Sequence, residues 1–328
     1  MTTTALVTGA SGYVGSRLVS ALHRGGARVV ATGRSTDSLS ELDWPEDVTR
    51  AALDVSDADS CREALASAGH VDVLYYLVHV VGADDFAAKD LASARTLAQA
   101  AQEAGVGRIV YLGGLVPDGE ELSEHLRSRA AVGTELGSHG VDLVWLRAAI
   151  ILGAGSTSYE FVRQLVDRLS VVVPLPRWMD AAVQPIAIDD VLAYLVAAGT
   201  DRVPPGAYDV AGPDTLTYAS LVRQYAELAG LNRRLLRVRG VTPAMAAPVV
   251  ARLTAVPTPM VQDLVHSMVN DMEADDADIR GLLADVADGL TTVRDALVRA
   301  GTDARPRGVH ASDDALHLAT TDPDWARG

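Results

Sequence analysis

The stretch that most constrains the fold is TALVTGASGYVGSRLVSAL, residues 4–22, in which Gly9, Gly12 and Gly15 stand three apart. Strand-type residues precede these glycines and an amphipathic helix pattern follows them. Such glycines let the chain turn sharply, let backbone N–H groups approach a pyrophosphate, and let the helix pack close to a sheet. The helix N-terminus then faces the phosphate charge. The stretch predicts a strand, a phosphate-binding turn and a helix; the alternative is an ordinary tight turn of an α/β protein.

The composition narrows the class of protein. The 328 residues carry a formal charge of −15, which argues against a nucleic-acid or anionic-membrane partner. One cysteine, Cys61, excludes an internal disulfide, and no apolar run reaches the roughly 18 residues of a membrane helix. No signal peptide precedes the first strand. We therefore expect a cytoplasmic monomer or homodimer that acts on a small molecule.

Strand patterns alternate with helix patterns over the first 150 residues, which predicts a doubly wound parallel sheet in the α/β class. The first expected strand contains Leu6 and Val7, and further strands are expected in residues 27–35, 71–79, 108–115 and 141–153. Residues 48–60 are expected to give the third strand and a helix start, and a long helix is expected near 85–104. Residues 1–155 are expected to form the dinucleotide-binding core, with returning segments near 184–212. Residues 156–300 are expected to form a small C-terminal lobe, in which 233–240 is either a strand or a solvated edge. The polar tail, 301–328, is expected to be loosely held.

The motif TGASGYVG resembles the opening of the extended and atypical short-chain dehydrogenases/reductases. The segments VDVLYYLVH, RIVYLGGLVPDGEELSEHLRSRAAVG and QPIAIDDVLAYLVAA further resemble the NmrA-like, NAD(P)H-binding branch of that superfamily. This resemblance implies a Rossmann-type fold with a substrate lobe and a nicotinamide dinucleotide cofactor. The ending DPDWARG resembles the approach to a second, fused domain of that branch, so the chain resembles a form that lacks it.

The cofactor prediction depends on the end of the second strand. Where an acidic residue would bind the ribose of NAD, this chain has Arg34, whose guanidinium suits the 2′-phosphate of NADP. The alternative is that Arg34 is an ordinary solvated surface arginine. Because the acidic Asp37 lies a little further along the chain, NAD(H) remains an alternative cofactor. Asp54 and Val55 resemble the pair that touches adenine, although Asp54 also suits a turn or cap. The expected cofactor-binding residues are Thr8, Gly9, Ser11, Gly12, Tyr13, Val14, Gly15, Arg34, Ser35, Asp54, Val55, Leu77, Val78, His79 and Arg129.

The catalytic prediction starts from a departure. The resembling family uses Ser, Tyr and Lys, with the last two spaced YxxxK, but here His125 and Arg129 take that spacing and the serine position falls at Gly113 and Gly114. His125 is predicted to exchange a proton, and Arg129 to bind ribose or an oxyanion. A surface position is the alternative for His125. Gly113, Gly114 and Tyr159 are expected to line the substrate pocket, and no metal site is predicted.

Three functions remain open from the sequence. The first is an NADPH-dependent reductase with a substituted triad, acting on an unknown small molecule in secondary metabolism. The second is a protein that binds NADP as a redox sensor. The third is a non-redox isomerase, dehydratase or cyclase on the same fold, because a fold alone does not determine the reaction.

Overall fold

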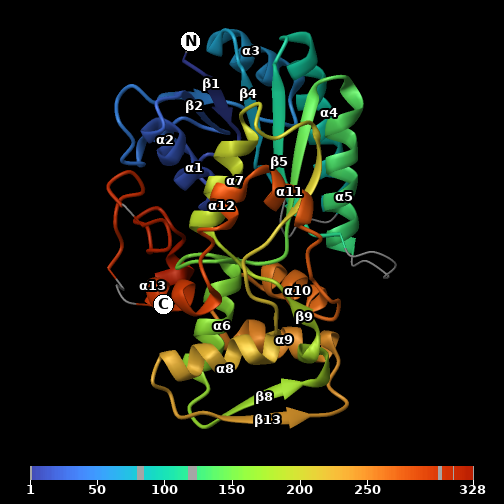
Figure 1. Cartoon of the computed structure of the whole chain (residues 1–328), viewed down its shortest axis with the longest axis vertical. Helices are drawn as coiled ribbons and strands as arrows, with labels where there is room; N and C mark the ends of the chain where they lie inside the picture. The colour runs from blue at the N-terminus through green and yellow to red at the C-terminus, as the bar shows by residue number, and fades with distance from the viewer. Residues whose placement is uncertain (1, 80–84, 117–123, 302–304, 313, 328) are drawn as a thin grey trace.

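The computed structural model describes residues 2–79, 85–116, 124–301, 305–312 and 314–327, except for the side chains of residues 124 and 125 (Figure 1). Its centre is a seven-stranded parallel sheet, which confirms the predicted doubly wound α/β fold. The chain changes direction between β1 and β4, and open α/β sheets bind ligands beside the carboxyl ends of strands at such a switch point. In spatial order the strands are β3 (Thr49–Ala52), β2 (Arg28–Gly33), β1 (Thr4–Val7), β4 (Val73–Tyr76), β5 (Arg108–Gly114), β6 (Asp142–Ala148) and β11 (Gly206–Val210).

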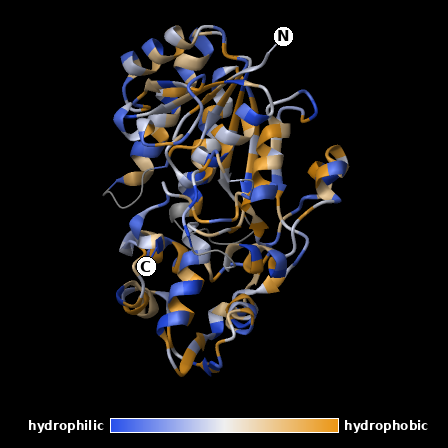
Figure 2. Ribbon diagram, turned by 90° about the vertical axis from the view of Figure 1, so that its left-hand side faces the viewer, coloured by the Kyte–Doolittle hydropathy of each residue, from blue (hydrophilic) through white to orange (hydrophobic). Residues whose placement is uncertain are grey.

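Helices cover both faces of the sheet, so its central strands β1 and β4 are buried on both sides, whereas the edge strand β3 is partly exposed. On β4, the neighbouring side chains of Tyr75 and Tyr76 enter the two opposite apolar cores. Figure 2 shows the apolar residues gathered in the central strands. None of the helices in the described ranges is long and apolar enough to cross a membrane. One face carries α1 (Tyr13–Arg24) and α7 (Ile188–Ala198), and the other carries α3 (Ala58–Ala68), α4 (Phe86–Glu103) and α5 (Glu124–Leu136).

A smaller lobe follows the sheet, at the bottom of Figure 1. Its strands β8 and β13 pair in parallel, so the 233–240 segment does contain a strand. The lobe is built from α6 (Thr157–Arg168), β8 (Val172–Pro176), α8 (Tyr218–Leu228), β13 (Arg234–Val238), α9 (Pro243–Leu253) and α10 (Thr258–Ser267). One short helix, α2 (Asp37–Ser40), follows β2 beside the sheet. The remaining strands and α-helices are β7 (Ile151–Leu152), β9 (Ala182–Val183), β10 (Ile186–Ala187), β12 (Leu216–Thr217), α11 (Ala277–Leu282), α12 (Ala284–Ala287) and α13 (Val293–Gly301).

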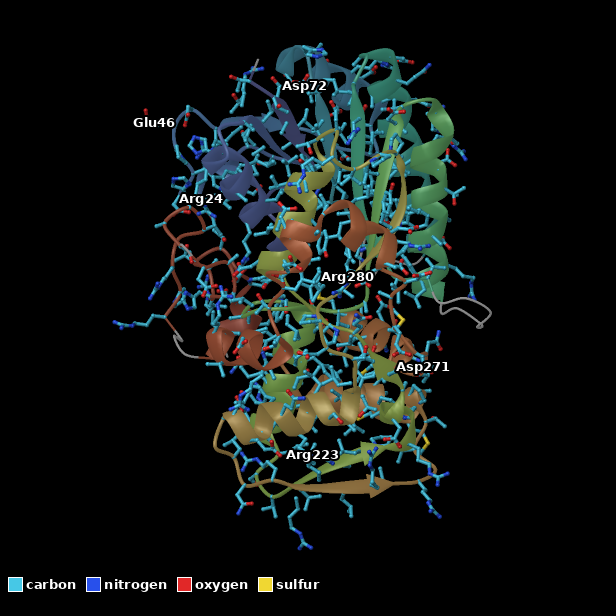
Figure 3. The ribbon with its side chains drawn as sticks, viewed as in Figure 1. Arg24, Glu46, Asp72, Arg223, Asp271 and Arg280 are labelled. Atoms are coloured by element: carbon cyan, nitrogen blue, oxygen red, sulfur yellow. The ribbon has the colours of Figure 1, made fainter. Side chains whose placement is uncertain are left out.

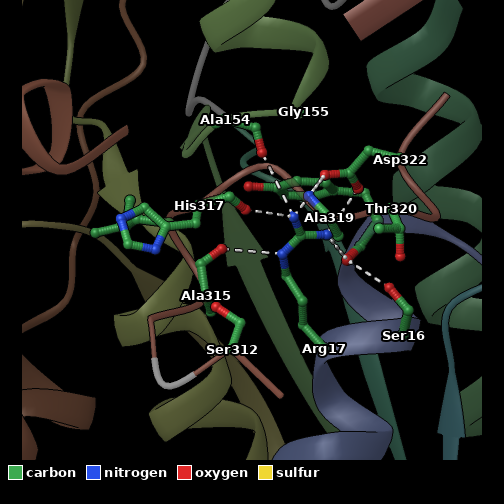
Figure 4. A network of polar contacts seen from close by, with 12 residues as sticks. Ser16, Arg17, Ala154, Gly155, Ser312, Ala315, His317, Ala319, Thr320 and Asp322 are labelled. Carbon is green, nitrogen blue, oxygen red and sulfur yellow. Dashed lines mark hydrogen bonds and ion pairs between the residues drawn. The ribbon is translucent and has the colours of Figure 1, made fainter. Parts of the chain in front are cut away.

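The tail after α13 is firmly docked, so the expectation of a loosely held tail is wrong for its described residues. The Arg17 guanidinium on α1 forms a buried ion pair with Asp322, with 2.7 Å between Nη2 and Oδ2 (Figure 4). Arg17 also donates hydrogen bonds to the carbonyls of Ala315 and His317, at 2.9 and 3.0 Å. Leu316 of the tail is fully buried. A buried charge on α1 therefore requires the tail as its partner, and composition alone did not reveal this.

The indole of Trp145 on β6 fills a slot between two glycines. A β-carbon added to Gly113 on β5 would lie 2.5 Å from the indole nitrogen, and one added to Gly133 on α5 would lie 2.6 Å from the ring. A β-carbon on Gly114, the next residue of β5, would meet only the flexible end of Leu126 at 3.3 Å and Arg129 at 3.9 Å. Trp145 thus excludes a side chain at Gly113, one of the two glycines at the family's serine position.

This packing predicts different stabilities for two neighbouring variants. Gly113→Ala forces the partly buried indole to move and should lower the free energy of unfolding by about 2 kcal/mol, as overpacked cores do. Gly114→Ala should change it by less than about 1 kcal/mol, because Leu126 can adjust. Urea denaturation of both proteins measures the difference. Equal losses in the two variants would contradict the proposed role of the slot.

Candidate functional site

The glycine turn has the geometry of an anion-binding loop. Gly9 has a φ of +65°, which favours glycine. A β-carbon on Gly15 would lie 2.2 Å from the carbonyl oxygen of Gly9, so only glycine lets α1 start so close to β1. Gly12 is the N-cap of α1, and no described side chain caps this helix end. The first amides of α1 are therefore open to a bound anion.

The other loop residues divide into two roles. Thr8 is buried, and its hydroxyl donates to the carbonyl of Tyr75 and accepts from the amide of Leu77, which holds the end of β4 beside the loop. The Tyr13 ring lies under Arg17, with 4.0 Å from the guanidinium carbon to the ring centre. Burial raises the pKa of the Tyr13 phenol well above its ordinary value, so this group stays neutral. Ser11 is exposed and Val14 is half-buried at the same loop.

Polar residues follow β2 and β3 at the neighbouring edge. Arg34 is exposed and forms no ion pair within the described part of the chain. The Ser35 hydroxyl accepts the amide of Asp37 at 3.0 Å. The Asp54 carboxylate accepts the amide and hydroxyl of Ser56, which holds its pKa below the ordinary range, with a smaller contribution from Arg34. Asp54 thus makes a local turn, and Val55 behind it is buried; contact of this pair with adenine stays a prediction.

The carboxyl end of β4 brings an imidazole and a buried carboxylate together. His79 Nδ1 lies 3.2 Å from Asp90 Oδ2 on α4. Asp90 is 2% exposed, whereas the His79 side chain keeps 20% of its surface exposed. Burial lowers the pKa of His79 below its ordinary value, and Asp90 opposes this shift. Neutral imidazole is therefore the form of His79 near pH 7.

Arg129 stands beside this pair. Its charge acts on His79 and Tyr111, its backbone carbonyl accepts the Tyr111 hydroxyl at 3.2 Å, and its side chain packs over Gly114. The predicted residues Leu77, Val78, His79, Gly114 and Arg129 therefore gather at the carboxyl ends of β4 and β5. The His79 imidazole and the Arg129 guanidinium, which carries a permanent charge, therefore lie at the same end of the sheet.

Three other predicted residues lie away from the His79–Asp90 pair or outside the described residues. The side chain of His125 lies outside the described residues, so its predicted catalytic role is not tested. Tyr159 on α6 is buried in the lobe, where its ring packs edge to face with Tyr225. Gly113 faces the Trp145 slot. Among the residues that the structure describes, no group of His, Cys, Asp and Glu side chains has the geometry to hold a metal ion.

Asp90 is the functional candidate that the sequence reasoning missed. It lies on the buried stripe of α4, in line with Ala94, Leu97 and Ala101. A carboxylate on the apolar face of a helix needs a partner, because burying an unpaired charge is costly. A charged residue at a helix position that the apolar pattern predicts to be buried was therefore the sequence signal for Asp90.

Comparisons with known proteins agree with the fold described above. Residues 5–130 match the model of the NAD dependent epimerase/dehydratase family. L-xylulose reductase of Bos taurus is 42% identical over 72 residues, which are 21% of this chain and 29% of that protein. Sterol demethylase protein B of Methylococcus capsulatus is 37% identical over 113 residues, 33% of each protein. The matched parts thus span a third or less of these two relatives.

The solved structures extend the similarity to most of the chain. WbmH of Bordetella bronchiseptica, solved in complex with NAD+, superposes with a TM-score of 0.67 at 16% identity, over 92% of this chain and 97% of that one. Such an identity shows the fold alone. The NmrA-like assignment stays a prediction, since none of these similarities is specific to that branch. Residues 5–130 therefore resemble the NAD dependent epimerase/dehydratase family, and most of the chain shares the fold of WbmH.

Proposed function

We propose that this protein is an NADPH-dependent reductase of a small molecule. The observation that carries the proposal is the position of the His79–Asp90 pair and Arg129 at the carboxyl ends of β4 and β5, on the sheet whose β1 leads into an uncapped helix N-terminus. One of the two sequence relatives is named a reductase, which supports the same class. The cytoplasmic location and the monomeric or dimeric state belong to this proposal.

The residues present fit a nicotinamide dinucleotide. A side chain at Gly12 would reduce the space that a pyrophosphate needs beside the loop. The backbone amides of Tyr13 and Val14 follow at the start of α1. Arg34 follows β2, where the family places the group that selects between the two dinucleotides. When bound, a nicotinamide cofactor supplies a hydride. The WbmH structure holds NAD+, so the preference for NADPH depends on Arg34 alone.

Residues of this chain would donate and accept the proton of the reaction. His79 is within hydrogen-bond distance of Asp90, which orients the imidazole and favours its protonated form. Protonated His79 donates a proton during reduction, and neutral His79 accepts one in the reverse direction. Arg129 keeps its charge and stabilises an oxyanion without exchanging a proton. His125, at the family's tyrosine position, is the competing proton donor.

A second candidate function is an acid–base reaction without net redox change, such as isomerisation or dehydration. The low pKa of His79 favours it, because a neutral imidazole is ready to abstract a proton. Deuterium-labelled NADPH distinguishes the two reactions. A reductase transfers one deuterium to each product molecule and oxidises one cofactor, whereas turnover with no net cofactor oxidation identifies the second function.

The phosphate cradle predicts that Gly12→Ala folds but loses cofactor. The new β-carbon is accommodated within the protein, with its nearest neighbour the Gly9 oxygen at 3.2 Å, but it occupies the side where the pyrophosphate approaches. We expect NADPH affinity to fall at least about tenfold, with the melting temperature nearly unchanged. Gly281→Ala, on α11, has no atom within 4 Å of the added carbon and is the matched control. Unchanged binding by Gly12→Ala would rule out this loop.

Arg34 predicts the cofactor preference. Arg34→Ala should weaken NADPH binding about tenfold and leave NADH binding nearly unchanged, because only NADPH carries the 2′-phosphate that a guanidinium binds. Calorimetric titration of both cofactors against both proteins measures the ratio of affinities. A wild-type protein that binds the two equally well, or a variant that keeps the preference, would show that Arg34 has no such role.

The His79–Asp90 pair predicts a pKa that can be measured without a substrate. Titration of the His79 imidazole by NMR should give a pKa below the ordinary value of about 6.5, because the ring is mostly buried. Asp90→Asn should lower this pKa further, since the carboxylate favours the charged ring. A rise in the pKa of this variant would contradict the assignment.

Kinetics then locates the proton donor. His79→Asn should reduce kcat by about 10²-fold, the usual scale of general acid–base catalysis. The matched control is His139→Asn, since His139 also pairs with a carboxylate, that of Glu135, but far from the end of β4. If His125→Asn produces the loss and His79→Asn does not, His125 is the donor.

A further inference from the structure

A cavity of about 380 Å³ lies between the glycine loop, the segment after β2 and the docked tail. Two of its walls belong to elements that form the dinucleotide site: Ser11 in the loop, and the residues that follow Arg34. The third wall, residues 320–327, comes from the other end of the chain. Its lining residues are Ser11, Ser38, Glu41, Leu42, Thr320, Thr321, Asp322, Pro323, Asp324 and Arg327.

The tail wall is held rigidly from behind. Asp322 is 3% exposed, pairs with Arg17 and accepts the amide of Ala319 at 2.7 Å. The carbonyls of Trp325 and Ala326 accept hydrogen bonds from Gln164 and Arg163 of α6, at 2.7 and 3.3 Å. Figure 4 shows how the Arg17 network gathers the tail against the start of α1. The wall is therefore pre-formed, which reduces the entropy lost when a ligand binds.

The lining chemistry suits a phosphate. Four residues with hydroxyl side chains line the cavity, and the hydroxyl of Thr321 is buried with no hydrogen-bond partner among the described residues. Arg327 is the one cation among the lining residues, and its side chain is 39% exposed. Of the three carboxylates, Asp322 is paired with Arg17, and Asp324 extends into solvent with its side chain 97% exposed, so it offsets the charge of Arg327 only weakly. Glu41 on the opposite wall is the carboxylate that opposes a bound anion.

Arg327 is already positioned. Its guanidinium donates to the carbonyls of Thr320 and Asp322, the latter at 3.1 Å, and lies 3.2 Å from Asp324. A guanidinium carries five N–H donors in one plane, so donors remain for a phosphate. We propose that the C-terminal segment completes the dinucleotide site and that Arg327 binds the pyrophosphate of the cofactor. This inference rests on the proposed function, because it requires a dinucleotide on the glycine loop.

The test compares Arg327→Gln with Arg223→Gln in the full chain. Arg223 is an exposed arginine on α8 in the far lobe (Figure 3) and is the matched control. NADPH, NADH and ADP all contain the pyrophosphate, so Arg327→Gln should weaken all three by the same factor, about tenfold. Arg327→Lys, which keeps the charge, should restore part of the affinity. The control should bind all three like the wild type.

The outcomes separate this inference from the function beneath it. Wild-type protein that binds none of the three ligands overturns both. Wild-type protein that binds them, with Arg327→Gln binding equally well, overturns only the role of the tail. A loss confined to NADPH also overturns it, because it would place Arg327 at the 2′-phosphate. Melting curves of each variant without ligand show whether a lost affinity reflects a lost fold. If the melting temperature falls equally in Arg327→Gln and Arg327→Lys, Arg327 stabilises the fold, and its role in binding the pyrophosphate is overturned.

Discussion

The structure depends on the close approach of α1 to the loop that precedes it. Because Gly15 has no β-carbon, the helix starts against the Gly9 carbonyl, which fixes both the position of its N-terminus and the direction of its axis. The N-terminus is then available to an anion beside β1. Arg17, on the same helix, forms its buried ion pair with Asp322 of the tail. One contact between two glycines thus sets the shape of the glycine loop and the position of the helix whose Arg17 pairs with Asp322, 305 positions away.

The buried pair of Arg17 and Asp322 has a different kind of importance. Two ions removed from water gain little net stability from each other, but removal of one leaves the other uncompensated, at a cost of about 3–5 kcal/mol. Here several backbone carbonyls also accept from the same guanidinium. The pair therefore acts mainly to select one position for the tail, beside the glycine loop.

The elements that local patterns determine were predictable. The Gly9–Gly15 loop, the strands around β4 and the long helix α4 all follow from spacing and apolar runs, and each is found where it was expected. The docked tail was not predictable, because Asp322 is buried only through a partner at the other end of the chain. Asp90 is a different case: its partner, His79, is only 11 positions away, and a carboxylate on the apolar stripe of α4 was a signal in the sequence that was not used. The site is thus predictable where one segment forms it and not where distant segments meet.

The indole of Trp145 has a consequence for the history of such a site. Gly113 and Gly133 leave room for that ring, and the ring in turn forbids larger residues at both positions. A sequence with a serine at Gly113 would need both Trp145 and Tyr111 to give way, and a smaller residue at 145 alone would leave a cavity beside the core. Each single step passes through a less stable protein. A side chain at Gly113 is therefore difficult to introduce by successive single substitutions, whatever chemistry the site performs.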